Sequence, residues 1–274
     1  MITTSELHRA ASSEGIRFDQ AEKDYVILWI LYGLSQSDPA PIGWTFKGGT
    51  CLRYCYFPGY RFSEDLDFSC QPGERSLEEA RLLLSRVAGW IQRKSGIAMV
   101  VKPAQTIPGD FQVEIPMQYN RGGLRRQALP HVKVHLTFDE PLVTEAVICP
   151  VKPRYSDLAE FETAAYSKVE IVGEKMRALL QQQRKWPRPR DLYDLWFMLG
   201  QTGVQLDPEK VKEVFVRKCP IRGLEPDFAG LTSENLRELN RSGWSKQLEP
   251  LMKSVPEFDR VWEEWVVTCR EIFG

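Results

Sequence analysis

The sequence contains no C-x-x-C pair and only three histidines, and its six cysteines are dispersed over 274 residues. A zinc site built from closely spaced cysteine and histidine ligands is therefore not expected. A disulfide framework is also not expected, because such frameworks belong mainly to short secreted chains. We expect reduced thiols that mostly fill the core.

Long apolar runs are also missing. The longest markedly apolar stretch, residues 25–34, is interrupted by a glycine, and a transmembrane helix needs about 20 residues. Residues 1–11 lack the charged and then apolar pattern of a signal peptide. We therefore expect a cytoplasmic protein with no membrane association.

An excess of charge of either sign is absent too. The 36 Lys and Arg residues nearly balance the 37 Asp and Glu residues, so the net charge is -1. This balance excludes a histone-like polycation, but a local basic patch could still bind phosphates. Apolar residues make up 43% of the chain, which is typical of a globular protein.

The pattern of apolar residues changes near residue 150. Before it, helical spacing predicts helices within residues 1–35 and 76–96. Alternating or short apolar runs predict strands over 44–46, 66–69, 97–102, 111–117 and 131–138. Residues 147–155 contain two prolines and are expected to be a connector, and helices are predicted beyond it over 168–184, 189–200, 207–217, 232–240 and 257–272. We therefore expect an α/β domain over residues 1–150 and a helical domain over residues 151–274.

Asp65 and Asp67 are the first candidate site residues. If this segment is a strand, alternation places both carboxylates on one face, about 6.6 Å apart along the strand, while Leu66 and Phe68 point into a core. Two such carboxylates raise each other's pKa unless a cation lies between them. A divalent metal supplies that charge, and metal pairs are a common device for phosphoryl displacement. The alternative is an exposed strand edge with two solvated aspartates.

The segment Lys47-Gly48-Gly49-Thr50 precedes this strand. Two residues without a Cβ allow backbone N–H groups to approach a phosphate closely. The alternative is a plain turn, but a glycine pair followed by Asp-x-Asp favours a nucleotide site.

Lys175 and Asp191 form a second candidate cluster. On helical wheels, each falls within the apolar arc of its helix, where a charged group is costly unless it is paired or faces a cleft. The alternatives are a lysine that extends its amine to solvent and an aspartate that favours the first turn of a helix.

Four segments together carry a family resemblance: K-G-G-T at 47–50, R-F-S-E-D-L-D-F at 61–68, E-K-M-R-A-L-L at 174–180 and R-D-L-Y-D-L at 190–195. In motif and order they resemble the AbiEii/AbiGii toxin family of bacterial toxin–antitoxin systems, within the nucleotidyltransferase superfamily that includes DNA polymerase beta. The resemblance spans about residues 44–200. It implies an α/β (α+β) nucleotidyltransferase fold with a mixed sheet, followed by an all-helical C-terminal half.

The resemblance also implies an activity, the transfer of a nucleoside monophosphate from an NTP to an acceptor, with the 3′ end of tRNA as the favoured acceptor. Asp65 and Asp67 would hold Mg²⁺, and Lys175 and Asp191 would complete the catalytic set. A cognate antitoxin, a winged-helix regulator, would be the partner. The residues that would position the NTP are Gly48, Gly49, Thr50, Arg61 and Ser63.

One position departs from the superfamily pattern. His135 stands where a third carboxylate is expected, and Glu114 and Asp139 are possible substitutes for it. Alternation places His135 on the face away from the core, so we expect it near Asp65 and Asp67 as a base or a weak metal ligand. The alternative is a histidine packed between the sheet and a helix.

Basic residues cluster near both motifs and could bind an RNA backbone. They are Arg184, Lys185, Arg188 and Arg190, with a second group at Arg121, Arg125 and Arg126 that could equally be an ordinary solvated loop. Rival functions are nucleotidyl transfer to a protein or a small molecule, and a non-catalytic nucleotide-binding module.

Overall fold

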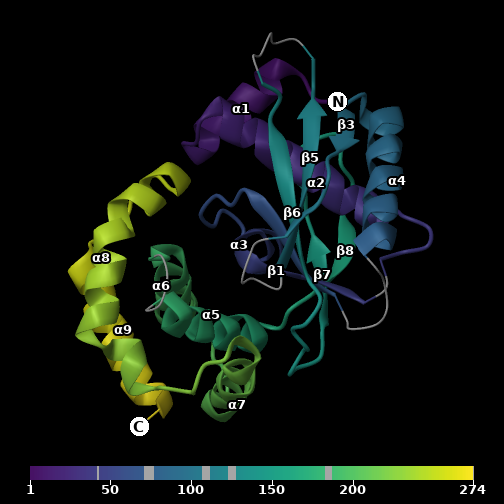
Figure 1. Ribbon diagram of the computed structural model, residues 1–274. Helices are drawn as coiled ribbons and strands as arrows, with labels where there is room; N and C mark the ends of the chain where they lie inside the picture. Colours follow the sequence, from purple (N-terminus) through teal and green to yellow (C-terminus); the bar gives the residue numbers. More distant parts are fainter. Residues whose placement is uncertain (42, 71–76, 107–111, 123–127, 183–186, 274) are drawn as a thin grey trace. The chain divides into compact units, whose positions relative to one another are not determined.

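The computed structural model describes residues 1–41, 43–70, 77–106, 112–122, 128–182 and 187–273. The chain divides into two units, one of residues 1–141 and 146–165 and the other of residues 142–145 and 166–274. Residues 146–165 lie on both sides of the expected boundary at residue 150. They belong to the first unit because they carry two strands of its sheet (Figure 1).

The first unit is built on a mixed sheet, as predicted. Among the described residues the strand order is β3-β5-β6-β2-β1-β8-β7, and β4 pairs with β5. The β2–β6 and β1–β8 pairs are parallel and the others are antiparallel. The strands are β1 (Trp44–Lys47), β2 (Asp65–Cys70), β3 (Ala98–Val101), β4 (Gln105–Thr106), β5 (Gln112–Asn120), β6 (His131–Thr137), β7 (Val147–Val151) and β8 (Phe161–Ala165).

The interpretation of residues 147–155 as a connector is wrong for β7. Cys149 and Val151 are buried, and the residues between and before them are exposed, which is the alternation of a strand with one face covered. Pro150 is tolerated because β7 is an edge strand, where a missing N–H need not leave a gap in the ladder.

The two faces of the sheet differ in polarity. Leu66 and Phe68 on β2 and Val134 and Leu136 on β6 are buried on one face. The register of these two strands with each other and with β1 and β5 places polar residues together on the opposite face. These polar residues are Thr45 and Lys47 on β1, Asp65, Asp67 and Ser69 on β2, Glu114 on β5, and Lys133, His135 and Thr137 on β6.

Helices α2 (Phe18–Ser35) and α4 (Leu77–Ser95) cover the apolar face (Figure 1). The Tyr32 ring of α2 lies 5.5 Å from the ring of Phe161 on β8, and Trp29 of α2 packs against Trp90 of α4. Helix α1 (Thr4–Glu14) precedes them and ends at Gly15, whose φ of 64° is the left-handed conformation that glycine adopts readily at a helix end.

The second unit is helical, and the predicted helices are found. They are α5 (Lys168–Gln182), α6 (Pro189–Trp196), which continues as a π-helix over Phe197–Gln201, α7 (Pro208–Lys218), α8 (Glu234–Leu248) and α9 (Phe258–Phe273). Apolar residues of α9 at helical spacing are buried, and the Trp265 indole donates a hydrogen bond to the carbonyl of Leu231 at 2.9 Å.

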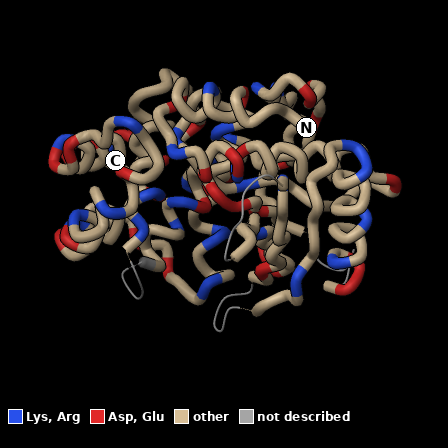
Figure 2. Tube along the Cα trace, turned by 90° about the horizontal axis from the view of Figure 1, so that it is seen from above, with Lys and Arg blue, Asp and Glu red and all other residues tan. Residues whose placement is uncertain are grey.

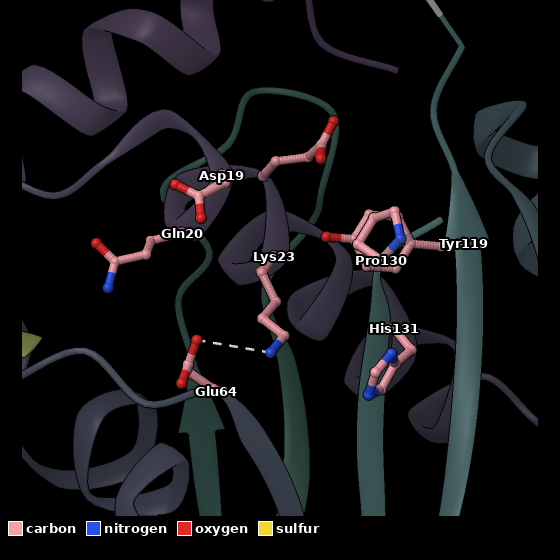
Figure 3. A pocket seen from close by; sticks show the side chains of 8 residues that line it. Asp19, Gln20, Lys23, Glu64, Tyr119, Pro130 and His131 are labelled. Atoms are coloured by element: carbon pink, nitrogen blue, oxygen red, sulfur yellow. Dashed lines mark ion pairs between the residues drawn. The ribbon is translucent and has the colours of Figure 1, made fainter. Parts of the chain in front are cut away.

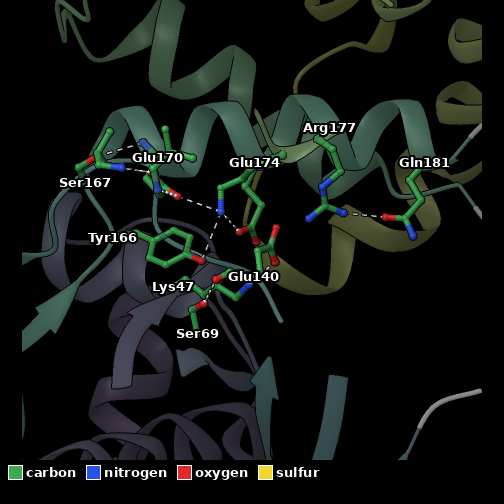
Figure 4. A network of polar contacts seen from close by, with 12 residues as sticks. Lys47, Ser69, Glu140, Tyr166, Ser167, Glu170, Glu174, Arg177 and Gln181 are labelled. Atoms are coloured by element: carbon green, nitrogen blue, oxygen red, sulfur yellow. Dashed lines mark hydrogen bonds and ion pairs between the residues drawn. The ribbon is translucent and has the colours of Figure 1, made fainter. Parts of the chain in front are cut away.

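Lys218, which is fully buried, holds part of this unit together through Glu170 and Glu174, two α5 residues labelled in Figure 4. Lys218 on α7 lies 2.9 Å from Glu170 and 3.2 Å from Glu174, both on α5. Glu170 in turn accepts a hydrogen bond from the backbone N–H of Thr144 at 2.9 Å. The cluster of Lys218, Glu170 and Glu174 thus also fixes residues 142–145 to α5.

The contact between α5 and α7 yields a stability prediction. A Cβ added at Gly173 would lie 2.4 Å from Val214 Cγ1 and 3.0 Å from the backbone nitrogen of Phe215. Gly173→Ala should therefore lower the free energy of unfolding by about 1–3 kcal/mol through overpacking. Gly200→Ala is the control, because a Cβ there meets nothing within 4 Å. Urea denaturation followed by tryptophan fluorescence measures both, and equal stabilities would contradict the close packing of α5 and α7.

Candidate active site

Asp65 and Asp67 lie on one face of β2, as alternation predicted, and β2 lies between β1 and β6. Burial and the neighbouring charge of Asp67 raise the pKa of Asp65, while the positive charges of His135 and Lys23 act in the opposite direction. The two carboxylates therefore repel each other as expected, and the site favours the addition of positive charge between them.

His135 lies beside Asp67, and its expected position is confirmed. The parallel register of β2 and β6 pairs Asp67 with His135, and the antiparallel register of β5 and β6 pairs His135 with Glu114. The imidazole Nδ1 is 3.0 Å from Asp67 Oδ1, and Nε2 is 3.3 Å from Glu114 Oε2. The alternative of a histidine packed between sheet and helix is wrong, because its ring bridges two carboxylates on the polar face.

The charges of this row favour an imidazolium. Burial works to lower the pKa of His135, but the carboxylates of Asp67, Asp65 and Glu114 outweigh burial and raise the pKa to about 9. Burial also acts to raise the pKa of Glu114. Lys133, at 2.9 Å, and His135 outweigh burial, so the pKa of Glu114 is lowered overall. Such a charged histidine acts as a positive neighbour of Asp67 more readily than as a base.

Glu114, one of the two substitutes for the third acid, thus belongs to the same row of side chains as Asp67. The other, Asp139, follows the end of β6 at Thr137 and lies outside this register.

The glycine pair begins α3 (Gly48–Cys51) directly after β1 and allows neighbouring side chains to approach the backbone more closely than a Cβ would permit. Gly48 has a φ of 79°, and a Cβ there would lie 2.3 Å from Asp67 Oδ2. A Cβ at Gly49 would lie 2.9 Å from both Arg61 Nη2 and Ser63 Oγ. The backbone of the two glycines, Arg61 and Ser63 therefore meet in one place beside Asp67, which we call the glycine cradle.

Two neighbours hold this cradle in position. The fully buried Thr50 donates its hydroxyl to the carbonyl of Asp65, which ties α3 to β2 and favours a positioning role for this residue. Arg53, in the π-helix Leu52–Tyr56 after α3, is buried, donates to the carbonyl of Tyr60, and pairs with Asp24 of α2 at 3.3 Å. The loop before Arg61 is thus fixed to the end of α3 by a buried guanidinium.

Lys175 and Asp191 are brought together within the second unit. Lys175 Nζ lies 2.7 Å from Asp191 Oδ1 and 2.7 Å from Asp194 Oδ2. The lysine side chain is 11% exposed, that of Asp191 is 16% exposed and that of Asp194 is fully buried. We expected a charged residue on the packed side of each helix to need a partner. This expectation is confirmed, because Lys175 and Asp191 form an ion pair with each other.

The basic residues have mixed outcomes. Arg188 is exposed and Arg190 is half-buried at the start of α6, whereas Arg184 and Lys185 lie outside the described residues. Arg121 is used within the first unit, where it donates to the carbonyl of Ile2 at 3.0 Å, and Arg125 and Arg126 are also outside the described residues. Over both units, positive and negative residues are interspersed (Figure 2).

The donor set of the first unit fits a divalent metal that is shared with a substrate. In the part of the chain that the structure describes, no three His, Cys, Asp or Glu side chains form a ready metal-binding group. Mg²⁺ is commonly held by one or two carboxylates together with the phosphates of a nucleotide. Asp65 and Asp67 supply two such carboxylates, and the glycine cradle brings backbone, Arg61 and Ser63 close to Asp67.

These features agree with a family comparison. The family described as nucleotidyl transferase AbiEii toxin, of type IV toxin–antitoxin systems, matches residues 29–264. The chain belongs to the AbiEii family. It is therefore a nucleotidyltransferase and a toxin of a toxin–antitoxin system, and the family implies an NTP substrate, an antitoxin partner and, in general, a divalent metal.

Solved structures show the same fold as this AbiEii chain. MenT4, a nucleotidyltransferase toxin from Mycobacterium tuberculosis H37Rv, is 20% identical with a TM-score of 0.69, and the match covers 100% of this chain and 89% of that one. JHP933 from Helicobacter pylori is 18% identical with a TM-score of 0.61, and the match covers 94% and 93%. No curated protein matches the chain. Among the described residues, no helix has the length and hydropathy to cross a membrane.

Sequence reasoning did not single out Asp194 as a site residue. A signal for it was present, because Asp191 and Asp194 are three residues apart and so share one helix face. Lys133 was also missed, and its ion pair with Glu114 could not be seen before the register of β5 and β6 was known.

The glycine cradle yields a prediction with a matched control. Gly48→Ala should abolish nucleotidyl transfer, because the new Cβ would displace the Asp67 carboxylate. Gly59 has the same φ of 79°, but a Cβ there meets nothing within 4 Å. Gly59→Ala should therefore lower the free energy of unfolding by about 1–2 kcal/mol, which is the cost of the left-handed φ at either glycine, and should keep its activity. Transfer assays and thermal melts separate the two effects, and equal activity of the two variants would show that the space beside Asp67 is not needed.

The Lys175 cluster yields a prediction about burial. Asp194→Asn should lower the free energy of unfolding by about 2–4 kcal/mol, because it removes one partner of a buried ion pair. Asp191→Asn makes the same chemical change at a more exposed position. It should lower the free energy of unfolding by less than about 1 kcal/mol. The two variants are compared by urea denaturation, and a larger loss in Asp191→Asn would contradict this ranking.

Proposed function

We propose that the protein transfers a nucleoside monophosphate from an NTP to the 3′ end of tRNA in the cytoplasm, with Mg²⁺, and that a winged-helix antitoxin restrains it. The observation that carries this proposal is the Asp65–Asp67 carboxylate pair directly beside the glycine cradle. Carboxylates that bind a divalent ion, next to backbone that can approach phosphates, are the parts that phosphoryl-group transfer requires.

In this proposal, the residues of the first unit have different roles in metal binding, phosphate binding and positioning. Asp65 and Asp67 would hold Mg²⁺, which when bound neutralises charge that develops on the phosphates. Gly48 and Gly49 would receive the triphosphate, with Arg61 and Ser63 as donors to its oxygens. His135 keeps Asp67 in one orientation through its 3.0 Å contact.

In the transfer, the acceptor hydroxyl oxygen bonds to the α-phosphorus of the NTP. The bond from that phosphorus to the bridging oxygen breaks, pyrophosphate leaves, and the hydroxyl proton passes to solvent. No enzyme nucleophile is needed, so the chain contributes position and charge.

Lys175 and Asp191 are proposed to act on phosphate charge. Two carboxylates at 2.7 Å fix the position of the ammonium group before any substrate arrives. Asp191 is the more exposed of the two, so a phosphate oxygen can approach the lysine from its side while Asp194 keeps the lysine in place.

The tRNA acceptor is supported by the sequence, because the basic residues Arg184, Lys185, Arg188 and Arg190 could bind an RNA backbone. MenT4, which has the same fold, is described as a nucleotidyltransferase toxin. The rivals are transfer to a protein or small molecule, and nucleotide binding without transfer.

The test is incubation of the protein with each labelled NTP, Mg²⁺ and total RNA, with a protein extract and a small-molecule pool as parallel acceptors. Label should enter the tRNA band, and Asp67→Asn should reduce the rate at least about 10³-fold, because the metal-binding carboxylate is lost. Glu162→Gln, on the exposed side of β8, is the control and should transfer normally. Label in protein or in small molecules, or full activity of Asp67→Asn, would overturn the proposal.

A further inference from the structure

A pocket lies in the first unit, at the end of the sheet where β2 and β6 begin and β5 ends (Figure 3). Its volume is about 200 Å³. We call it the α2 pocket. It is lined by Asp19, Gln20 and Lys23 of α2, by Glu64, and by Tyr119 and His131 at the ends of β5 and β6.

The α2 pocket lies beside the start of β2. Glu64, which lines the pocket, directly precedes Asp65 in the chain, and Lys23 pairs with Glu64 at 3.6 Å. In the sheet, β2 separates β1, which leads into the cradle, from β6, which begins at the pocket. Asp65 and Asp67 therefore lie between two sites that could each hold part of a substrate.

This order matches the geometry of phosphoryl transfer. The attacking and leaving oxygens lie roughly in line on opposite sides of the transferred phosphorus. If the triphosphate occupies the cradle, the acceptor hydroxyl has to approach the transferred phosphorus from the side opposite the leaving group. The α2 pocket, at the start of β6, is separated in the strand order from β1 and the cradle by β2.

The charges of the pocket disfavour a phosphate as its ligand. Lys23 pairs with Glu64 at 3.6 Å, Asp19 pairs with Arg17 at 2.9 Å, and Glu22, which also lines the pocket, lies 3.8 Å from Arg121. Each carboxylate thus has a cationic partner, and the lining offers no excess of positive charge. Such a lining suits an uncharged ligand that is rich in hydrogen-bond donors and acceptors.

The size of the pocket restricts the ligand further. Sites for drug-sized molecules occupy about 300–1,000 Å³, so 200 Å³ accommodates a sugar or a single base and not a whole nucleotide with its phosphates. The Lys23–Glu64 pair is loose and partly exposed, so its ammonium and carboxylate can also serve a ligand as donor and acceptor.

We propose that the α2 pocket binds the base or the ribose of the terminal nucleoside of the acceptor strand, through hydrogen bonds from Lys23 and to Glu64, and so holds the end of that strand beside the start of β2, next to Asp65. This inference rests on the proposed nucleotidyl transfer to RNA. It assigns the acceptor and the NTP to different sides of β2.

The experiment compares KM for the RNA acceptor with KM for the NTP in Lys23→Met and His131→Ala. Loss of a hydrogen bond from a charged group should raise KM for the acceptor about tenfold in Lys23→Met, and KM for the NTP should stay within about twofold. His131→Ala, at an exposed position, should raise the same constant by a smaller factor. Lys152→Met is the matched control, because Lys152 forms an exposed ion pair with Glu160 at the same 3.6 Å and does not line the pocket.

The outcomes separate this inference from the proposed function. A raised KM for the NTP with an unchanged KM for the acceptor would assign the pocket to the NTP and overturn the inference, as would unchanged constants in both pocket variants. If the wild-type protein labels no RNA, the proposed function fails. The pocket is then judged by NMR titration with adenosine and cytidine. Binding that weakens in Lys23→Met supports a nucleoside site, and the lack of binding by either overturns it.

Discussion

The repulsion between Asp65 and Asp67 is the constraint around which the polar face of the sheet is arranged. Two adjacent carboxylates, one of them with a raised pKa, are tolerated only where positive charge is close. His135 provides part of it from the next strand, and Lys133 and Glu114 complete a row of alternating charge across β5 and β6. The Asp67 carboxylate also lies directly against the backbone of Gly48, where a Cβ would be 2.3 Å from its Oδ2, so the glycine allows the carboxylate to keep this position.

The same alternation couples this site to the stability of the unit. Leu66 and Phe68 are buried on the opposite face of β2 from the aspartates, so a shift of one residue in register would exchange the core and the site. The carboxylates are therefore held by the packing of the core under α2 and α4. This arrangement suits a site that acts by fixed charge, since catalysis of this kind depends on groups that do not reorganise during the reaction.

Local patterns were sufficient for much of this organisation. Alternation predicted the orientation of Asp65, Asp67 and His135, and helical spacing predicted the helices of the second unit. Features that depend on long-range pairing were not accessible: β7 was hidden by Pro150, whose place at a sheet edge is known only once the strand order is known. The buried Arg53 is a similar case, because its partners Glu14 and Asp24 are distant in sequence, and nothing local distinguishes it from an exposed arginine.

Two buried lysine–carboxylate clusters lie among the described residues of the second unit, and their difference in exposure separates structure from candidate chemistry. Lys218 is completely enclosed, with Glu170 equally buried beside it, so no ligand could reach its amine without unfolding the contact between α5 and α7. Lys175 retains 11% exposure, and its partner Asp191 retains 16%. Under the proposed function, a substrate phosphate would compete for Lys175, while the buried Asp194 limits the movement of the lysine. Both clusters satisfy the requirement that a buried charge be paired, but only the second leaves one partner exchangeable, and that property is what a phosphate-binding lysine needs.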